Sequence, residues 1–276
     1  MAKKAVTKAV VKTAPKPQQA VAKANVNVDM LLDQYAGAGV STDASDNTIP
    51  FIYLVQSLSP VALKSRSEYI KGAEAGNIWP RGEKQVWDGE EGIRVIPCYF
   101  SKCWVEWMPN RGGFVERHET KPSQAELRTD PKDPKKKAWE MPNGNVVQES
   151  REHTVLVLDK YDHPTPFVIP MTGTNLKSSK DWMTLMNRKL TSKGDIAPAF
   201  AYSYNLTTIA RTNDRGDWYM WEASDDEKVE DATVLQEAIR IYKAFKGGQL
   251  TGAADNYDMD SDAHEDNTEG EENEIA

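Results

Sequence analysis

The chain has 276 residues, 39% of them hydrophobic and 28% charged, which is typical of a soluble globular protein that carries some unstructured sequence. No stretch approaches the roughly eighteen consecutive apolar residues of a membrane helix, and the N-terminus lacks the apolar core of a secretory signal. The two cysteines, Cys98 and Cys103, do not suggest a secreted disulfide scaffold and indicate reduced thiols in a cytoplasm.

The net charge of −8 conceals a strong partition along the chain. Residues 1–27 contain six lysines and no acidic residue, whereas residues 247–276 contain ten acidic residues and no Lys or Arg. Such segments bury too little apolar surface to offset the entropy of ordering. We therefore predict a disordered basic arm and linker over 1–46, a folded domain over 47–246 and a disordered acidic tail over 247–276.

From about residue 50, aromatic and β-branched residues cluster in short runs separated by Gly, Pro and Asn, the pattern of β structure. Five main strands are predicted, over residues 93–108, 154–159, 166–171, 200–212 and 217–223. Pro97 indicates an edge position or a bulge in the first of them. Helices are predicted over 178–190 and 228–245, and the polar segment 119–150 is predicted to be an extended loop.

The resulting order is three strands, a helix and two strands. This is the order of an OB-fold, a five-stranded Greek-key barrel with its helix between the third and fourth strands. We therefore expect a mainly β, OB-fold-like barrel with an additional C-terminal helix and disordered termini. The long loop would join the first and second strands, a connection that this fold often uses for ligand contact.

No catalytic signature is present in the sequence. The segment Gly72–Gly76 lacks the lysine and the strand–helix context of a phosphate-binding loop, and we find neither a nucleophile elbow nor a recognisable pair of catalytic carboxylates. The sequence therefore predicts a protein that is not an enzyme and that needs no cofactor.

A metal site is weighed and not favoured. Two cysteines and two histidines have the composition of a zinc site: Cys98, Cys103, His118 and His153. The cysteines lie five apart in one strand pattern, which places them on opposite faces unless a bulge intervenes, so buried thiols are the preferred interpretation. The tail aspartates lack the Gly and the closing Glu of an EF-hand calcium loop.

Aromatic and basic side chains are interleaved along the first strand and the last two strands. Single-stranded DNA binding needs both, because bases stack on aromatic rings for roughly 1–3 kcal/mol each and cations follow the phosphates. Core packing is the competing explanation for any one aromatic residue, and it is favoured for Phe200, Tyr202, Tyr204 and Leu206. The predicted DNA-contacting residues are Arg94, Tyr99, Lys102, Trp104, Trp107, Arg111, Arg117, Lys177, Lys180, Arg211 and Trp218. A basic run at Lys132–Lys137, beside Trp139, is either a solvated loop or a flap that contacts phosphates.

Several segments resemble, in order, a group of tailed-phage proteins: DNTIPFIYLVQSLSP, YIKGAEAGNIW, GIRVIPCYFSKCWVEWMPNRGGF, SSKDWM, and FAYSYNLTT with GDWYMWEA. The resemblance covers roughly residues 47–223 and is to phage single-stranded DNA-binding proteins with an OB-fold and an acidic C-terminus. It implies a DNA replication or recombination protein in the cytoplasm of the infected bacterium, with replication or recombination proteins as partners of the tail. Ile275 is the one apolar candidate anchor at the tip of the tail.

Two alternative functions stay open at this point. A strand-annealing recombination protein would share the composition of a passive coat, and nothing in the sequence excludes a structural or assembly protein of the virion. In the DNA-binding interpretation, the acidic tail would imitate nucleic acid and compete for the basic groove.

Overall fold

The computed structural model describes residues 48–109, 113–130, 133–214 and 216–252. For residues 133–136 it describes the backbone alone. All of these residues belong to one compact unit. The predicted basic arm, the acidic tail from residue 253 onward, Arg111 and the basic run before Lys137 lie outside the described side chains.

The prediction of a mainly β protein is confirmed. The strands are β1 (Thr48–Ile49), β2 (Ile52–Leu54), β3 (Ile78–Pro80), β4 (Ile93–Trp107), β5 (Phe114–His118), β6 (Glu126–Asp130), β7 (Asp133–Glu140), β8 (Val146–Val157), β9 (Thr165–Thr172), β10 (Tyr202–Asn213), β11 (Gly216–Lys228) and β12 (Thr251–Gly252). The described helices are α2 (Asn175–Asn187) and α3 (Ala232–Lys246), with short 3-10 turns at η1 (Pro60–Ala62) and η3 (Ala199–Ala201). Neither helix has the length and apolarity that a membrane crossing requires.

The five predicted main strands correspond to β4, β8, β9, β10 and β11, and the two predicted helices to α2 and α3. The prediction of an extended loop over 119–150 is wrong, because this segment contains β6, β7 and the start of β8. Its polar composition lacks the apolar alternation of a half-buried strand. A two-stranded ribbon exposed on both faces forms from backbone pairing without that alternation.

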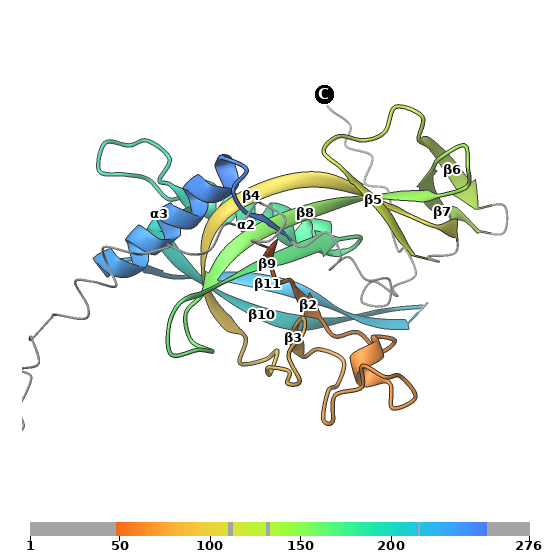
Figure 1. The fold of residues 1–276 in the computed structure, drawn as a ribbon, viewed down its shortest axis with the longest axis horizontal. Coiled ribbons are helices and arrows are strands. Elements are labelled where there is room, and N and C mark those ends of the chain that lie inside the picture. The colour runs from red at the N-terminus through yellow and green to blue at the C-terminus, as the bar shows by residue number, and fades with distance from the viewer. Residues whose placement is uncertain (1–47, 110–112, 131–132, 215, 253–276) are drawn as a thin grey trace, which may run out of the picture. The chain divides into compact units, whose positions relative to one another are not determined.

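β4 is the central strand of the main sheet (Figure 1). It pairs antiparallel with β8 along one edge, while β10 and β5 share its other edge. The eight-stranded sheet has the order β11-β10-β4-β8-β7-β6, with β5 added on β4 and β9 on β8. A closed five-stranded barrel is not confirmed, because β9 and β11 do not pair within the described part of the chain, and α2 packs against both of them.

Within the described residues no further strand pairs with the outer edge of β11, and side chains provide hydrogen-bond partners for it. The Gln56 amide donates from Nε2 to the Tyr219 carbonyl at 2.9 Å and accepts from the Tyr219 N–H at 3.0 Å. The Trp221 carbonyl accepts from the Ser178 hydroxyl at 2.6 Å, and the Trp221 N–H donates to Asn175 Oδ1 at 2.9 Å. These contacts provide hydrogen-bond partners for backbone N–H and C=O groups that have no partner strand and are shielded from water.

The main core lies between the sheet and α2. Its fully buried members include Ile93, Val155, Trp182, Tyr204 and Leu206. The prediction of core packing holds for the last two, and the predicted bulge in β4 is found between Pro97 and Tyr99. Neither cysteine forms a disulfide in the described part of the chain, and both are buried, in two hydrophobic clusters that each include Phe245 of α3.

Candidate nucleic-acid interface

Two tryptophans and a lysine meet at the end of the sheet that carries β5, β6 and β7. The rings of Trp104 in β4 and Trp139 in β7 lie edge to face, with centroids 6.2 Å apart and planes at 89°. Lys121, which precedes β6, places its Nζ 3.4 Å from the Trp139 ring centroid and 6.0 Å from that of Trp104. We call these three residues the tryptophan–lysine cluster. Both rings are half-buried and Lys121 is exposed.

The register of the sheet explains why the two rings share one face. Trp139 lies opposite Val147 of β8, and Trp104 lies opposite Glu149 of the same strand. Because residues two apart in a strand point to the same face, the two tryptophans flank β8 on one side of the sheet. Leu127 of β6 lies opposite Trp139, which extends this face by a side chain that is 50% exposed.

Charges around the cluster are mixed. Lys102 is exposed and two residues from Trp104 in β4, so it lies on the same face. Arg151 lies opposite Lys102 and is engaged by Glu149, with Nε to Oε1 at 2.9 Å. Lys137 is also exposed and lies two residues from Trp139 in β7. Lysines at 102, 121 and 137 are therefore cations that this face offers to a phosphate, beside rings that a base can stack on.

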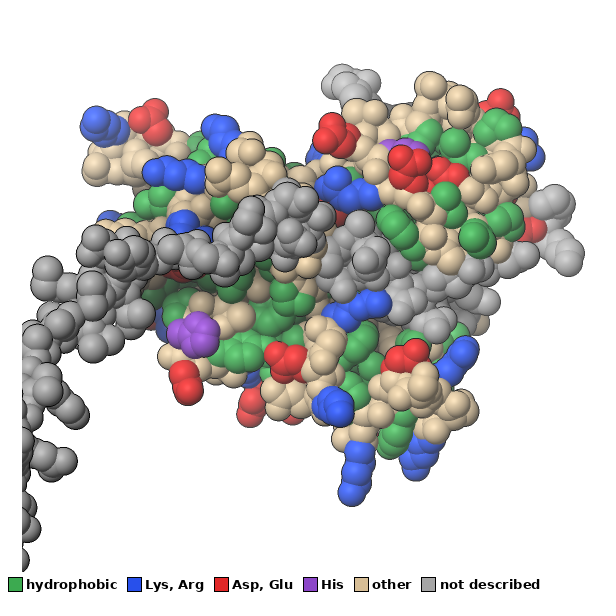
Figure 2. Space-filling view, viewed as in Figure 1, with side chains coloured by type: hydrophobic (Ala, Val, Ile, Leu, Met, Phe, Trp, Pro, Cys, Tyr) green, Lys and Arg blue, Asp and Glu red, His purple; other side chains and the backbone are tan. Residues whose placement is uncertain are grey.

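The surface of this region exposes apolar side chains among charged ones. Figure 2 shows Lys and Arg interspersed with Asp and Glu on the face in view, with hydrophobic side chains gathered over β5, β6 and β7. Met108, Val115 and Leu127 are 49%, 40% and 50% exposed. A binding face at this end would therefore depend on stacking and on a few cations rather than on a broad positive field.

Two predicted aromatic contacts are occupied by packing instead. The ring of Tyr99 is stacked on Phe245 of α3 with centroids 5.7 Å apart. Trp107 is 5% exposed and packs edge to face on Phe114 at 6.1 Å. Tyr99 and Trp107 are five and three residues from Trp104 in β4, and an odd spacing places them on the opposite face of the sheet. α3 and the N-terminal strands cover that face.

Two predicted arginines lie in ion pairs within the sheet. Arg94 donates from Nε to Asp226 at 2.5 Å and also pairs with Glu227, and the hydrogen bond to Asp226 raises the pKa of its guanidinium. Arg117 donates to both oxygens of Glu152, at 3.0 and 2.7 Å. Glu152 is 7% exposed, so its charge requires this partner.

The remaining predicted contacts lie on other elements. Arg211 and Trp218 are directly opposite each other in β10 and β11, and Arg211 is exposed. Lys177 and Lys180 are exposed on α2, and Lys177 Nζ forms an ion pair with Asp181 Oδ2 at 2.8 Å. In the strand order, β4 and β8 separate the Arg211–Trp218 pair from β7. Of the predicted residues that the structure describes, Lys102 and Trp104 thus lie together beside the tryptophan–lysine cluster, and Arg211 and Trp218 form a separate pair on β10 and β11.

Trp139, Lys121 and Leu127 were missing from the predicted contacts. The sequence placed all three in a presumed loop, where no register relates them to β4. Trp139 beside a basic run was the one signal that pointed to this segment. The pairing of β7 with β8 supplies the missing relation.

A group of potential metal ligands adjoins the cluster. Ligand atoms of Glu106, Glu116 and His118 lie within 4.8 Å of one another, and His118 is opposite Trp104 in the β4–β5 ladder. The buried Glu106 accepts from Asn145 Nδ2 at 2.5 Å and contacts His118 Nε2 at 2.8 Å. Burial alone would raise the pKa of Glu106, but these hydrogen bonds outweigh it and lower the pKa. The three residues have the donor types of a divalent-metal site, and in this structure Glu106 is satisfied by hydrogen bonds.

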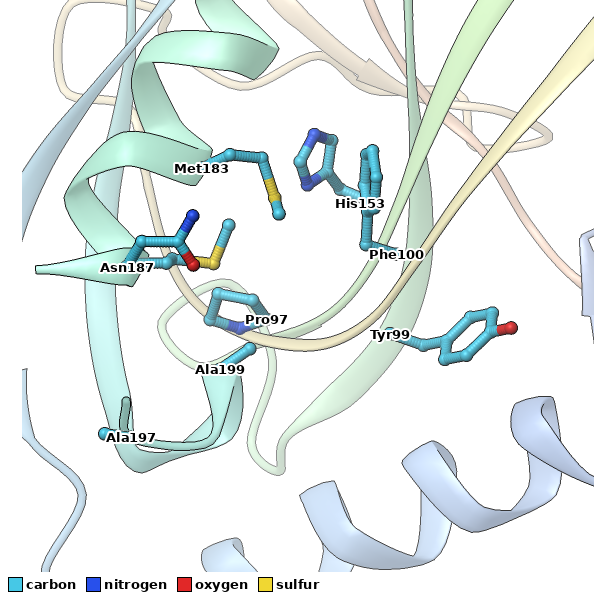
Figure 3. Close-up of a pocket in the computed structure, with 9 residues that line it drawn as sticks. Pro97, Tyr99, Phe100, His153, Met183, Asn187, Ala197 and Ala199 are labelled. Carbon is cyan, nitrogen blue, oxygen red and sulfur yellow. The ribbon is translucent and has the colours of Figure 1, made fainter. Parts of the chain in front are cut away.

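A small cavity of about 80 Å³ lies between β4, β8 and α2 (Figure 3). At its wall, His153 stacks on Trp182 at 4.6 Å and hydrogen-bonds the Ser179 hydroxyl at 2.8 Å. Burial lowers the pKa of His153 to about 3, so the imidazole is neutral at pH 7. The cavity is lined by Pro97, Tyr99, Phe100, His153, Met183, Met186, Asn187, Ala197 and Ala199. Because the lining is mostly apolar, we interpret this cavity as a packing defect of the core rather than as a catalytic site.

Comparison with known proteins identifies a phage family. The model of the Pam3 phage gp34-like protein family matches residues 20–251. The match covers most of the chain, with every strand of the main sheet and both helices α2 and α3. No curated protein and no solved structure matches. The match supports the predicted phage origin. The chain belongs to the family of Pam3 phage gp34-like proteins.

Proposed function

We propose that this protein binds and protects single-stranded DNA, largely independently of sequence, during phage DNA replication or recombination. The observation that carries the proposal is the tryptophan–lysine cluster. Every base has a flat face that stacks on an indole ring, so such a surface accepts any sequence. Lys121 and Lys102 provide charge for the phosphates that accompany stacked bases. This is the role of a binding protein, with no reaction to catalyse.

The strand pairings support an OB-like origin for the sheet. In this proposal β4, β8, β9, β10 and β11 are the five barrel strands, and α2 fills the opening between β9 and β11. OB-folds bind nucleic acid with the connection between their first two strands. That connection is the segment between β4 and β8, which carries Lys121 and Trp139.

The proposal extends to the acidic tail and to the setting in which the protein acts. A polyanionic tail competes with DNA for a cationic surface, so it weakens loose binding and leaves tight single-strand binding in place. Membership of a phage family supports action in the cytoplasm of the infected host. Replication or recombination proteins of the phage are the proposed partners of the tail.

Substitutions in the cluster test the proposed site. Trp139→Ala should weaken binding of a labelled oligothymidine by about 5- to 150-fold, the range of one lost base stack. Lys121→Ala should weaken it less and reduce the salt dependence by about one phosphate contact. Fluorescence anisotropy at low salt measures both effects.

Lys71→Ala is the matched control, because Lys71 is an exposed lysine between η1 and β3. It should bind as the wild type does, and Trp139→Phe should retain most of the affinity. Wild-type affinity in Trp139→Ala would place the binding surface elsewhere. A wild-type chain that does not bind oligothymidine would contradict the proposed function and favour a role in virion structure or assembly.

A further inference from the structure

We propose that β6 is a pairing edge through which two copies of this chain form a symmetric dimer. β6 ends the strand order of the main sheet, and within the described residues no strand pairs with its outer edge. The side chains of Glu126 and Arg128 are 76% and 57% exposed, and Leu127 is 50% exposed. An exposed strand edge presents unpaired N–H and C=O groups that a second strand can use.

The sequence of β6 is complementary to itself in one antiparallel register. When two copies pair about Leu127, each Glu126 lies opposite Arg128 of the second copy, and the two leucines lie opposite each other. Shifting the centre to Arg128 would instead oppose Arg to Arg and Glu126 to Asp130. Opposite charges directly across a ladder are favourable and like charges unfavourable, so the charges select the first register.

The β6–β7 ribbon carries a charge imbalance that this pairing relieves. Glu126 lies directly opposite Glu140, a like-charged cross-strand pair. Arg128 serves both carboxylates, with Nε 3.6 Å from Glu140 and Nη2 4.0 Å from Glu126. A second copy would bring its own Arg128 to each Glu126, so that every carboxylate of Glu126 faces a cation.

The usable edge has a natural limit. The last residue of β6 is Asp130, and the β6–β7 ladder is irregular just before it, where the partner changes from Lys137 to Asp133 of β7. The register centred on Leu127 pairs Glu126–Arg128 of the two copies and lies wholly within β6. β6 contains no proline, so each of its residues has a backbone N–H. The N–H of Ala125, just before β6, already donates to the Pro122 carbonyl at 3.0 Å.

The dimer would have a consequence for DNA that rests on the proposed function. Leu127 and Trp139 share one face of the sheet. Residues directly opposite in an antiparallel pair also share a face. The two tryptophan–lysine clusters would therefore lie on the same face of one continuous sheet, where a single DNA strand can cross both.

Sedimentation of the full-length chain without DNA tests the dimer by charge exchange. The wild type should sediment as a concentration-dependent dimer. E126R and R128E should each weaken the dimer by roughly tenfold or more, because each places two like-charged pairs across the ladder. An equimolar mixture of the two variants should form a heterodimer, and the double variant E126R/R128E should dimerise as the wild type does.

Glu222→Arg is the control, since Glu222 is an exposed glutamate in β11. It should leave the dimer unchanged, and circular dichroism should show that every variant is folded. A wild type that stays monomeric, single variants that dimerise normally, or a mixture that gives no heterodimer would each overturn the proposal. Because no DNA is present, a dimer that fails to bind oligothymidine would remove the proposed function and leave this inference standing.

Discussion

His153 shows what a single buried side chain contributes to this molecule. It is 1% exposed, stacked on Trp182 and hydrogen-bonded to Ser179. Its folded-state pKa of about 3 lies below the ordinary histidine value. Protons therefore bind the unfolded chain more readily than the folded one between these two values. The stability associated with a neutral His153 is complete above about pH 6.5 and is lost as the pH falls below it.

The prediction at this scale concerns acid stability. Urea unfolding of the wild type should show a loss of roughly 1.4 kcal/mol per pH unit from this residue between about pH 6 and about pH 4. His153→Gln should lack that part of the slope, although it is less stable at neutral pH. His163→Gln, at an exposed histidine, is the control and should behave as the wild type. Equal slopes in His153→Gln and the wild type would show that His153 does not titrate as described.

At the scale of elements, the free edge of β11 is completed by side chains from distant parts of the sequence. Gln56 is 3% exposed and acts as a one-residue substitute for a strand, because its amide donates to and accepts from the Tyr219 backbone. Asn175 and Ser178 do the same for Trp221 from the start of α2. At β11 the sheet thus has no further strand among the described residues, while the backbone groups of Tyr219 and Trp221 have side-chain partners.

Gln56→Leu should therefore destabilise the protein strongly. The substitution keeps similar volume but removes the partners of the part-buried N–H and carbonyl of Tyr219, which costs about 1–3 kcal/mol in unfolding free energy. Ser57→Ala, at the exposed neighbouring position, should change stability by less than about 0.5 kcal/mol. Chemical denaturation of both variants measures the difference. A Gln56→Leu protein as stable as the wild type would mean that Tyr219 finds other partners.

Elements with an apolar pattern were predictable from the sequence, and polar ones were not. Alternation identified Tyr204 and Leu206 as core and located β4, β8, β9, β10 and β11, because burial imposes that alternation. β6 and β7 were not predicted because most of their residues are polar, and Leu127 and Trp139 alone do not give an apolar alternation. Trp139 and Lys121 were missed with them, since their proximity depends on long-range register. The Gln56–Tyr219 contact, across 163 positions, has no local signal at all.

At the scale of the whole molecule, the folded body and the acidic tail are adjacent in sequence. β12 pairs in parallel with β1, and Leu250 packs against two hydrophobic clusters. Residues up to Gly252 therefore contribute to the folded body. The acidic residues all follow this point, from Asp255 onward, so the tail can be removed without disturbing β12.

If the tail competes with DNA as proposed, truncation after Gly252 should raise the affinity for oligothymidine at low salt, because it removes ten negative charges. The gain should shrink as salt screens the tail. A full-length variant with the tail carboxylates replaced by amides is the control for chain length and should bind like the truncated protein. Binding that is the same with and without the tail, for single and double strands, would refute competition.

The central claim is that the intact protein holds single-stranded DNA by stacking and by phosphate contacts. Titrating it with oligothymidine over a range of salt concentrations, while following tryptophan fluorescence, tests both parts together. We predict quenching on binding, and a logarithm of the binding constant that falls linearly with the logarithm of salt by about 0.7 per phosphate contact. Fluorescence that stays unchanged at low salt, with no binding at any DNA concentration, would contradict the claim.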